Sequence, residues 1–249
     1  MLYYLGEPFG KMVEQIPREQ TSCVELVDDG LHSLTKQRVS VLKTLGESYN
    51  LRYTVHAPFA GINIALPSKP MLNANLRVLK ESIVHASALN CEIWVFHPGL
   101  RSAVSMFYPG IDWSKNLESV RLLFHFARDY GVEAAIENVM DPFVLKSVDE
   151  FKRFYDEVGE DVGLVLDTGH ANLFGQVEKF LLNFSDRIVH IHAHDNHGKT
   201  DQHLGIGYGN IDWKAFADGL RRMSFSRIVM VESVENVQES LKKAKQMLN

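Results

Sequence analysis

Residues Ile188–Trp213 have the sequence IVHIHAHDNHGKTDQHLGIGYGNIDW, and this stretch contains the pattern that decides the fold of the chain. After Ile188, apolar and polar side chains alternate from Val189 to His192, which predicts a strand over Ile188–His192. The Gly-rich residues that follow predict a loop, and Trp213–Arg222 has the apolar spacing of a helix. A strand, a loop and a helix in this order form one unit of a protein in which parallel strands alternate with helices.

The same unit recurs along the whole chain of 249 residues. Strand-like runs are expected at Leu2–Leu5, Cys23–Val27, Arg52–His56, Glu92–His97, Val132–Glu137, Gly163–Asp167, Ile188–His192 and Arg227–Glu232. Helix-like stretches are expected at Gly6–Gln20, Leu31–Ser48, Ser68–Leu89, Trp113–Tyr130, Ser147–Val158, Val177–Phe184, Trp213–Arg222 and Val237–Leu248. Eight such units predict a single (β/α)8 TIM barrel. No linker or low-complexity tract interrupts residues 1–249, so one domain is expected.

The composition is that of a soluble globular protein, with 45% hydrophobic and 23% charged residues. The net charge of −5 gives no bulk basic signature for nucleic acid. The chain has two cysteines, Cys23 and Cys91, in apolar runs, where buried free thiols are expected. The N-terminus lacks the pattern of a signal peptide, and no apolar run reaches the length of a membrane span. A cytoplasmic protein without a membrane partner is therefore expected.

Residues able to bind a metal recur where the predicted strands end. Five strand runs finish on, or one step past, such a residue: His56, His97, Glu137, Asp167 and Glu232. The seventh run adds His192, and the loops that follow add His170, Asp201 and His203. In a (β/α)8 barrel the carboxyl ends of the strands form the active-site face. Because burying several carboxylates together is costly without a cation, this pattern predicts a divalent metal site, with Zn²⁺ first and Mn or Fe as alternatives.

Several motifs together carry a family resemblance: HAPF, FHPG, IEN, LDTGH, HIHAHD, DQHLGIGYGNIDW and VES. Their combination resembles the xylose-isomerase-like barrel superfamily, which includes the endonuclease IV group and the sugar isomerase/epimerase group. The endonuclease IV group carries three zinc ions, and the resemblance implies one to three ions here. The implied ligands are His56, His97 and Glu137 for the first ion; Glu137, Asp167, His192 and Glu232 for the second; and His170, Asp201 and His203 for the third.

The resemblance leaves two activities open. The complete set of nine ligand positions favours, narrowly, a phosphodiesterase of the endonuclease IV type, in which Glu137 positions the attacking water. The alternative is a sugar or sugar-phosphate isomerase/epimerase with one ion, in which Glu137 and Glu232 are the acid/base pair and His170 steadies a substrate oxygen. The substrate is then abasic DNA or a small phosphorylated or sugar molecule. The oligomeric state is not indicated by the sequence.

Three residues are candidates for binding the substrate: Phe59, Arg77 and Lys199. Phe59 stands where endonuclease IV enzymes insert a tyrosine beside the abasic site, so stacking is kept without the hydroxyl. Arg77 and Lys199 are candidate contacts for a substrate phosphate. The segment after the second strand, ELVDDGLHSL, is acidic where those enzymes have an aromatic and basic loop, which counts against DNA as the substrate.

Overall fold

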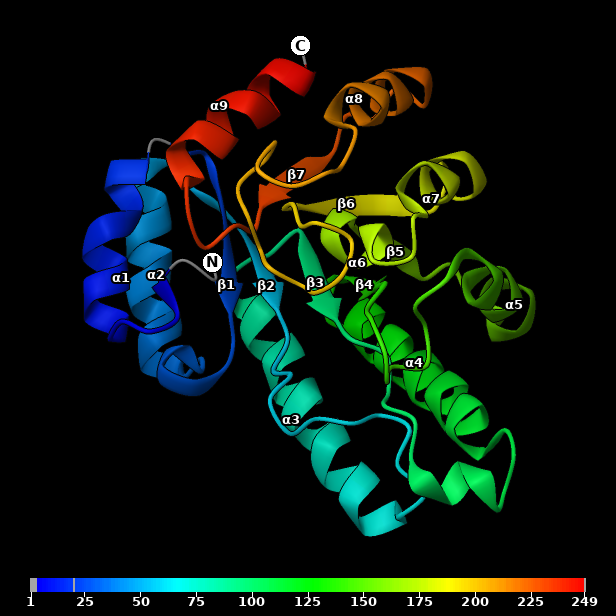
Figure 1. The fold of residues 1–249 in the computed structure, drawn as a ribbon. Helices are drawn as coiled ribbons and strands as arrows, with labels where there is room; N and C mark the ends of the chain where they lie inside the picture. Colours follow the sequence, from blue (N-terminus) through cyan, green and yellow to red (C-terminus); the bar gives the residue numbers. More distant parts are fainter. Residues whose placement is uncertain (1–3, 20, 249) are drawn as a thin grey trace. The chain divides into compact units, whose positions relative to one another are not determined.

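The computed structural model of the chain describes residues 4–19 and 21–248. Its internal contacts divide these residues into two compact units. The first unit runs to Ala135 and includes Pro142–Val144, and the second comprises Ile136–Asp141 and the residues from Leu145 onward. Each unit is built from parallel strands and helices that alternate along the chain (Figure 1).

The first unit contains the parallel strands β1 (Cys23–Val27), β2 (Arg52–His56) and β3 (Ile93–Phe96), which pair in chain order. The segments between and after them form α1 (Phe9–Gln15), η2 (Ile16–Glu19), η3 (Gly30–His32), α2 (Lys36–Tyr49), α3 (Lys69–Ala88), η4 (Ala103–Met106) and α4 (Ile111–Asp129). Strand β4 (Glu133–Glu137) begins in this unit and ends in the second.

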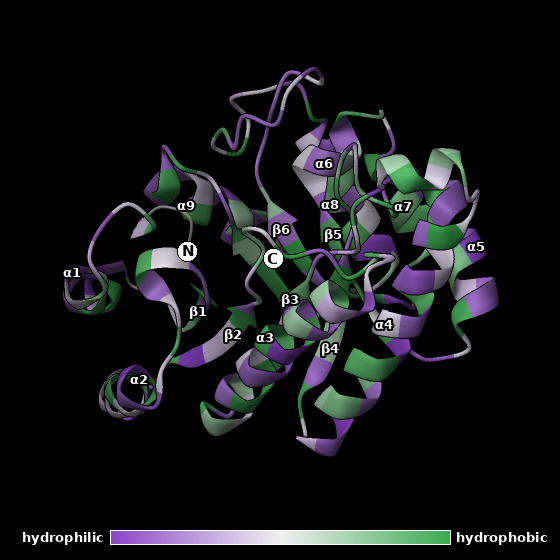
Figure 2. Cartoon of the chain, turned by 90° about the horizontal axis from the view of Figure 1, so that it is seen from below, coloured by the Kyte–Doolittle hydropathy of each residue, from purple (hydrophilic) through white to green (hydrophobic). Residues whose placement is uncertain are grey.

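Helices of the first unit cover its strands through buried side chains. The hydroxyl of Tyr53 on β2 donates to the carbonyl of Leu42 on α2. The indole Nε1 of Trp94 on β3 donates to Oγ of Ser82 on α3 at 3.1 Å, so Trp94 faces the helical layer. Helices α3 and α4 show alternating hydrophilic and hydrophobic bands in Figure 2, which is typical of helices with one buried face.

The second unit contains the parallel strands β5 (Gly163–Asp167), β6 (Ile188–Ala193) and β7 (Ile228–Val231), which also pair in chain order. Its helices are α5 (Val148–Val158), α6 (Thr168–Asn172), α7 (Val177–Asn183), α8 (Trp213–Arg222) and α9 (Val237–Leu248). The register aligns Asp167 on β5 with His192 on β6, and His192 with Met230 on β7. Polar residues at the carboxyl ends of β5 and β6 are therefore neighbours.

The start of α5 is fixed by a reciprocal pair of hydrogen bonds. The hydroxyl of Ser147 accepts from the backbone N–H of Glu150, and the Glu150 carboxylate accepts from the backbone N–H of Ser147. This reciprocal pair is a capping box, which satisfies two backbone donors at the helix start. Phe151 of α5 packs against Phe180 of α7 and against Phe184, so aromatic contacts join α5 to α7.

Two expectations about elements need correction, and one helix was not expected. Leu2 and Tyr3 of the expected strand Leu2–Leu5 lie outside the described residues, whereas Tyr4 and Leu5 form a helical turn and not a strand. The expected helix Leu31–Ser48 starts later, at Lys36, because the Thr35 hydroxyl caps it by accepting from the Arg38 N–H. The short helix α6 was not expected, because five residues are too few to show helical periodicity. The single-domain expectation stays a prediction.

None of the helices that the structure describes combines the length and the hydropathy that crossing a membrane requires.

Candidate metal centre

The strands of the second unit end in buried residues of the metal-ligand type. Glu137 is the last residue of β4, Asp167 the last of β5, and His192 the next to last of β6. Glu232 directly follows β7. All four are buried in the structure. The parallel register brings Asp167 beside His192, so the sequence positions at the strand ends become neighbours in space.

His192 lies among three carboxylates. Its Nδ1 atom is 3.3 Å from Oε2 of Glu137, 3.4 Å from Oε2 of Glu232 and 3.9 Å from Oδ2 of Asp167. One oxygen or nitrogen of each of Asp167, His192 and Glu232 lies within 4.8 Å of the others, which is compatible with a shared cation. Carboxylates and imidazole are the donor set that Zn²⁺ and Mn²⁺ accept in enzymes.

His170 lies on α6 and is placed by Asp167. The Asp167 carboxylate caps the helix by accepting from the His170 N–H at 2.7 Å. The His170 Nδ1 atom then lies 3.0 Å from the carbonyl oxygen of Asn138 and 3.2 Å from Oε1 of Glu137. Asn138 in turn bridges to β5, because its side chain accepts from the N–H of Asp167 and donates to the Asp167 carbonyl.

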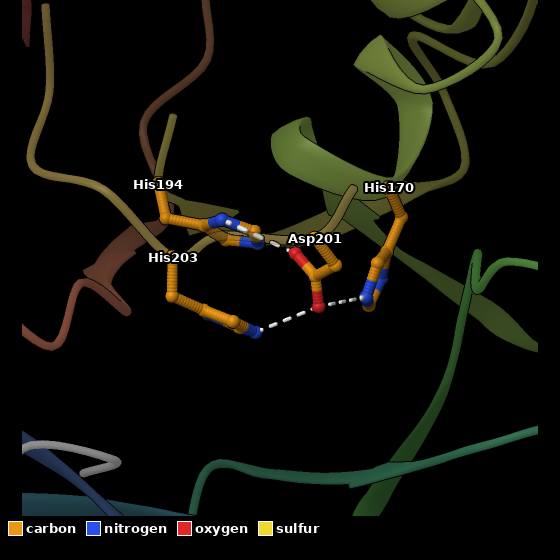
Figure 3. A group of neighbouring side chains, drawn as sticks. All are labelled: His170, His194, Asp201 and His203. Atoms are coloured by element: carbon orange, nitrogen blue, oxygen red, sulfur yellow. Dashed lines mark ion pairs between the residues drawn. The ribbon is translucent and has the colours of Figure 1, made fainter. Parts of the chain in front are cut away.

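A second cluster consists of His170, His194, Asp201 and His203, which Figure 3 shows around the Asp201 carboxylate. Oδ2 of Asp201 lies 3.4 Å from Nε2 of His170 and 2.9 Å from Nε2 of His203. Oδ1 of Asp201 lies 3.8 Å from Nδ1 of His194. The His194 and His203 rings stack at 3.9 Å between centroids. We refer to these four residues as the three-histidine cluster.

The proton affinities of these groups reflect an excess of negative charge. Burial would lower the pKa of His170, but the carboxylates of Asp167, Asp201 and Glu137 raise it well above its usual value. For His203, burial is likewise outweighed, chiefly by the hydrogen bond to Asp201, and the pKa rises to about 9. In both cases the nearby carboxylates favour the protonated form of the imidazole ring.

The pKa values of Glu232 and Asp167 are shifted in opposite directions. Burial raises the pKa of Glu232; His192 opposes this shift, and the charges of Glu137 and Asp167 add to it. For Asp167, burial would raise the pKa, but His170 and His194 lower it below its usual value. Burial and the neighbouring carboxylates therefore favour the protonated form of Glu232, whereas the nearby imidazoles favour the ionised form of Asp167.

The three-histidine cluster fits a metal ion. Nδ1 of His194 and Oδ1 of Asp201 are buried atoms that make no hydrogen bond within the described part of the chain, and they face each other at 3.8 Å. Buried polar atoms without partners are costly, and a cation between these two atoms would satisfy both. The donor chemistry of three imidazoles and one carboxylate suits Zn²⁺.

The loop after β6 is organised by Asp195. Its carboxylate accepts from the N–H groups of Gly207 and Ile211 and from the indole of Trp213. Gly209 passes so close that an added Cβ would lie 2.2 Å from Oδ1 of Asp195. The glycine at position 209 therefore permits close backbone packing around Asp195.

The first unit brings together His56, His97 and Phe59. The His56 and His97 rings lie 4.9 Å apart between centroids, and Phe59 contacts both. The backbone N–H of Phe59 donates to the carboxylate of Asp29, which fixes the turn that carries the aromatic ring. Phe59 is 38% exposed and so can contact a bound molecule.

The two remaining candidates for substrate binding, Arg77 in the first unit and Lys199 in the second, are both exposed. Arg77 is on α3, where it lines a groove of about 670 Å³ together with residues of α2 and Phe126 of α4. Lys199 is exposed in the loop of the second unit that precedes Asp201. Their assignment to substrate binding stays a prediction.

The family model of the xylose isomerase-like TIM barrel matches residues 21–249. This chain belongs to that family. The (β/α)8 fold class expected from the sequence is thereby confirmed, and so is the superfamily resemblance.

Three known proteins illustrate the range of this xylose isomerase-like family. A crystal structure of a D-tagatose 3-epimerase-like protein superposes with a TM-score of 0.89 at 25% identity, covering 97% of this chain and 92% of that one. An uncharacterised protein of Methanocaldococcus jannaschii is 28% identical and is matched over 97% of this chain and 84% of its own length. A probable endonuclease 4 of Halothermothrix orenii is 24% identical over 66% of this chain and 64% of its own length.

One residue of the site in this xylose isomerase-like protein was missed from the sequence. His194 is absent from the ligand positions expected from the sequence. In the structure it belongs to the three-histidine cluster. The signal was present in the sequence, because period two continues from His192 to His194, but the strand ends at Ala193 and a loop residue has no fixed direction.

Proposed function

We propose that this protein is a divalent-metal-dependent sugar epimerase or isomerase in which Glu137 and Glu232 are the acid/base pair. The observation that carries the proposal is the position of His192, whose Nδ1 is 3.3 Å from Glu137 and 3.4 Å from Glu232. Two buried carboxylates thus border the same place. A pair of carboxyl groups around one reacting carbon is what a proton transfer between its two faces requires.

The protonation of the pair supports distinct roles. The raised pKa of Glu232 lets this residue hold a proton in a buried site. We assign Glu137 to removal of the proton from the carbon beside the substrate carbonyl. The electrons of the broken C–H bond move onto the carbonyl oxygen, and Glu232 then gives its proton to the opposite face of the carbon. No oxidant or reductant is needed, and the roles of the two residues exchange in the reverse direction.

The residues that would hold the catalytic ion are Glu137, Asp167, His192 and Glu232. When bound, a divalent cation supplies charge stabilisation to the carbonyl oxygen and the neighbouring hydroxyl. His170 borders the same place, because its Nδ1 is 3.2 Å from the Glu137 carboxylate. Similarity over nearly the whole chain to a D-tagatose 3-epimerase-like protein supports a ketose as the substrate.

Solvent exchange tests this proposal directly. Protein loaded with Mn²⁺, Zn²⁺ or Co²⁺ is incubated in D₂O with a panel of ketoses that includes D-tagatose, and deuterium at the carbon beside the carbonyl is followed by NMR. We expect incorporation with at least one ketose, and none after treatment with EDTA. If no ketose exchanges while an abasic-site duplex is nicked, the epimerase proposal is wrong.

A second candidate is a phosphodiesterase of the endonuclease IV type, which the sequence alone placed narrowly first. The three-histidine cluster and the His56–His97 pair favour it, as does the similarity to a probable endonuclease 4. Ions bound by these groups would neutralise phosphate oxygens, and Glu137 would position a water. Phe59, Arg77 and Lys199 stay the candidate substrate contacts. We rank it second because that similarity covers 66% of the chain, against 97% for the epimerase-like structure.

A further inference from the structure

His194 has a position that the family resemblance does not assign. It directly follows β6 and is fully buried. Its backbone is held on both sides by Thr168 of α6, whose hydroxyl accepts from the His194 N–H and donates to the His194 carbonyl. Its ring occupies space that only a glycine leaves free, because a Cβ on Gly169 would lie 2.0 Å from the Cε1 atom of His194.

Each imidazole of the three-histidine cluster has one ring nitrogen beside an oxygen acceptor outside the cluster. Nδ1 of His170 lies 3.0 Å from the carbonyl of Asn138, and Nδ1 of His203 lies 3.0 Å from the carbonyl of Glu232. Nε2 of His194 lies 3.0 Å from both carboxylate oxygens of Asp167. An acceptor requires a donor, so these three nitrogens carry the ring protons.

The opposite nitrogen of each ring is then a lone pair in the neutral imidazole, and all three point toward Asp201. The distances to the Asp201 carboxylate are 3.4 Å from His170, 3.8 Å from His194 and 2.9 Å from His203 (Figure 3). Lone pairs and a carboxylate that face one another need positive charge among them, which protons on the rings or one metal ion can supply. Nδ1 of His194 and Oδ1 of Asp201 make no hydrogen bond within the described residues, and a metal ion would satisfy both. Outer acceptors that fix the tautomer of each histidine are a regular feature of metal sites.

We propose that His194 is a fourth protein ligand, which with His170, Asp201 and His203 closes a structural metal site that orders the loop after β6. The proposal rests on the proposed metal-dependent function. It adds His194 as a ligand to the third ion position that the family resemblance implies, and it gives that position a structural role. Four protein donors fill the coordination of a tetrahedral ion, as in structural zinc sites, whereas a catalytic ion keeps one position open.

The loop after β6 contains a closed segment that an ion at this site would stabilise. The ends of the loop are joined by two backbone hydrogen bonds between Asp195 and Leu204, both of 2.9 Å. Asp201 and His203 lie inside this closed segment, and His203 adopts a left-handed backbone conformation with φ of +47°. A non-glycine residue at positive φ is strained and persists only where its surroundings hold it. Ligation of His203 would supply that constraint.

His194 also connects the structural site to the catalytic one. The same ring that offers Nδ1 to the cluster holds Asp167 through Nε2, and Asp167 is a neighbour of His192 in the proposed catalytic site. His194 therefore acts on the proposed reaction as a positioning residue. A metal bound by the three-histidine cluster would fix the His194 ring. That ring orients Asp167, which is a proposed ligand of the catalytic ion.

The test compares His194→Gln with His197→Gln. Glutamine at 194 can keep the hydrogen bond to Asp167 but lacks the Nδ1 donor, and His197 is an exposed histidine in the same loop. The apoproteins are titrated with Co²⁺ and Zn²⁺, and bound metal is counted by elemental analysis. We expect wild type and His197→Gln to bind one ion more per chain than His194→Gln, whose affinity for that ion should fall by at least about 10- to 100-fold.

Two further readouts do not depend on activity. The visible absorption of bound Co²⁺ should have the intensity of a tetrahedral site in wild type, and this component should be lost in His194→Gln. Cleavage by trypsin after Lys199, which is exposed in the loop, should be slow in the metal-loaded wild type and fast in the metal-free protein and in His194→Gln. His194→Asn provides a second variant if the glutamine protein fails to fold.

The outcomes separate this inference from the proposed function. If His194→Gln keeps the tetrahedral spectrum and the full metal content, His194 is not a ligand. If wild type binds a single ion that His194→Gln also keeps, with ketose exchange intact, the structural site is disproved while the epimerase proposal stands. If wild type binds no ion at all, both proposals fail.

Discussion

Nδ1 of His192 lies 3.3 Å from Oε2 of Glu137, and Oε1 of the same carboxylate lies 3.2 Å from Nδ1 of His170. Glu137 is buried, so both of its oxygens face imidazoles and neither is free to rotate into water. A carboxylate fixed in this way is suited to accept a proton at one defined position.

Glu137→Gln is expected to lower kcat for deuterium exchange by about 10²- to 10⁴-fold, because the amide keeps the shape of the side chain but cannot accept the proton. The fold should be retained, because the substitution removes one charge from a cluster of buried carboxylates. Steady-state kinetics and circular dichroism measure the two effects. The control is Glu178→Gln, an exposed carboxylate on α7, which should leave both unchanged. Wild-type kcat in Glu137→Gln would exclude Glu137 as the base.

Metal uptake is expected to release protons in the pH range between about 6.5 and 9. In the metal-free protein, the carboxylates hold the pKa of His203 at about 9, above the usual value of 6.5, so its ring is protonated at pH 7.5. A metal needs the Nε2 lone pair and must displace that proton. Calorimetric titration in buffers of different ionisation enthalpy counts the protons released.

The same shift predicts how the metal-free protein responds to pH. A raised folded-state pKa contributes stability that is complete below the unfolded value of 6.5 and is lost as the pH rises through about 9. The Tm of EDTA-treated wild type should therefore fall between these pH values by more than that of His203→Gln. Equal slopes for the two proteins would show that His203 is not coupled to Asp201 in solution.

The strands were predictable because their hydrophobic pattern is local. The predicted runs Cys23–Val27, Arg52–His56 and Gly163–Asp167 match β1, β2 and β5 to the residue. Buried parallel strands consist of short apolar runs with sharp polar ends, and these ends are visible in the sequence. Helix α6 was not predictable in this way, because its start depends on the capping contact between Asp167 and His170 and not on periodicity.

The residue types of the site were predictable from the sequence, but the contacts that hold these residues in place were not. Strand phase is sufficient to place Asp167 and His192 side by side, because parallel register aligns the strand ends. The role of His194 depends instead on Thr168, which holds its backbone, and on Gly169, which leaves room for its ring. Such contacts join residues about 25 positions apart and have no periodic signature.

Gly169→Ala is expected to destabilise the protein by about 1–3 kcal/mol, because the added methyl group would overlap the His194 ring, which must move. Metal affinity of the three-histidine cluster should fall with it. The control is Gly10→Ala in α1, where no atom lies within 4 Å of the added Cβ and helix propensity favours alanine by up to about 1 kcal/mol. Urea unfolding of both variants measures the difference. An unchanged midpoint for Gly169→Ala would show that the His194 ring does not occupy this position.

The two cysteines are expected to react slowly with thiol reagents in the folded protein. Both are free thiols, and burial raises the pKa of Cys23 to about 11 and that of Cys91 still further. At pH 8 the reactive thiolate is therefore scarce. A colorimetric disulfide reagent should label both residues in urea and neither at a comparable rate in buffer. Rapid labelling of Cys91 in buffer would show that the end of the β3 segment opens readily.

Removal of metal should affect stability and activity together, because the same carboxylates serve both. Protein purified without chelator is expected to contain about one to three ions of Zn, Mn or Fe per chain. An ion at a concentration about 1,000-fold above its Kd stabilises the folded state by about 4 kcal/mol, so EDTA should lower Tm by several degrees. Elemental analysis and thermal unfolding, with and without added metal, test this directly. If the purified protein holds no metal and its Tm does not respond to Zn²⁺ or Mn²⁺, the buried carboxylates of Asp167 and Glu232 must be balanced by protons alone, and the metal-dependent reaction has no basis.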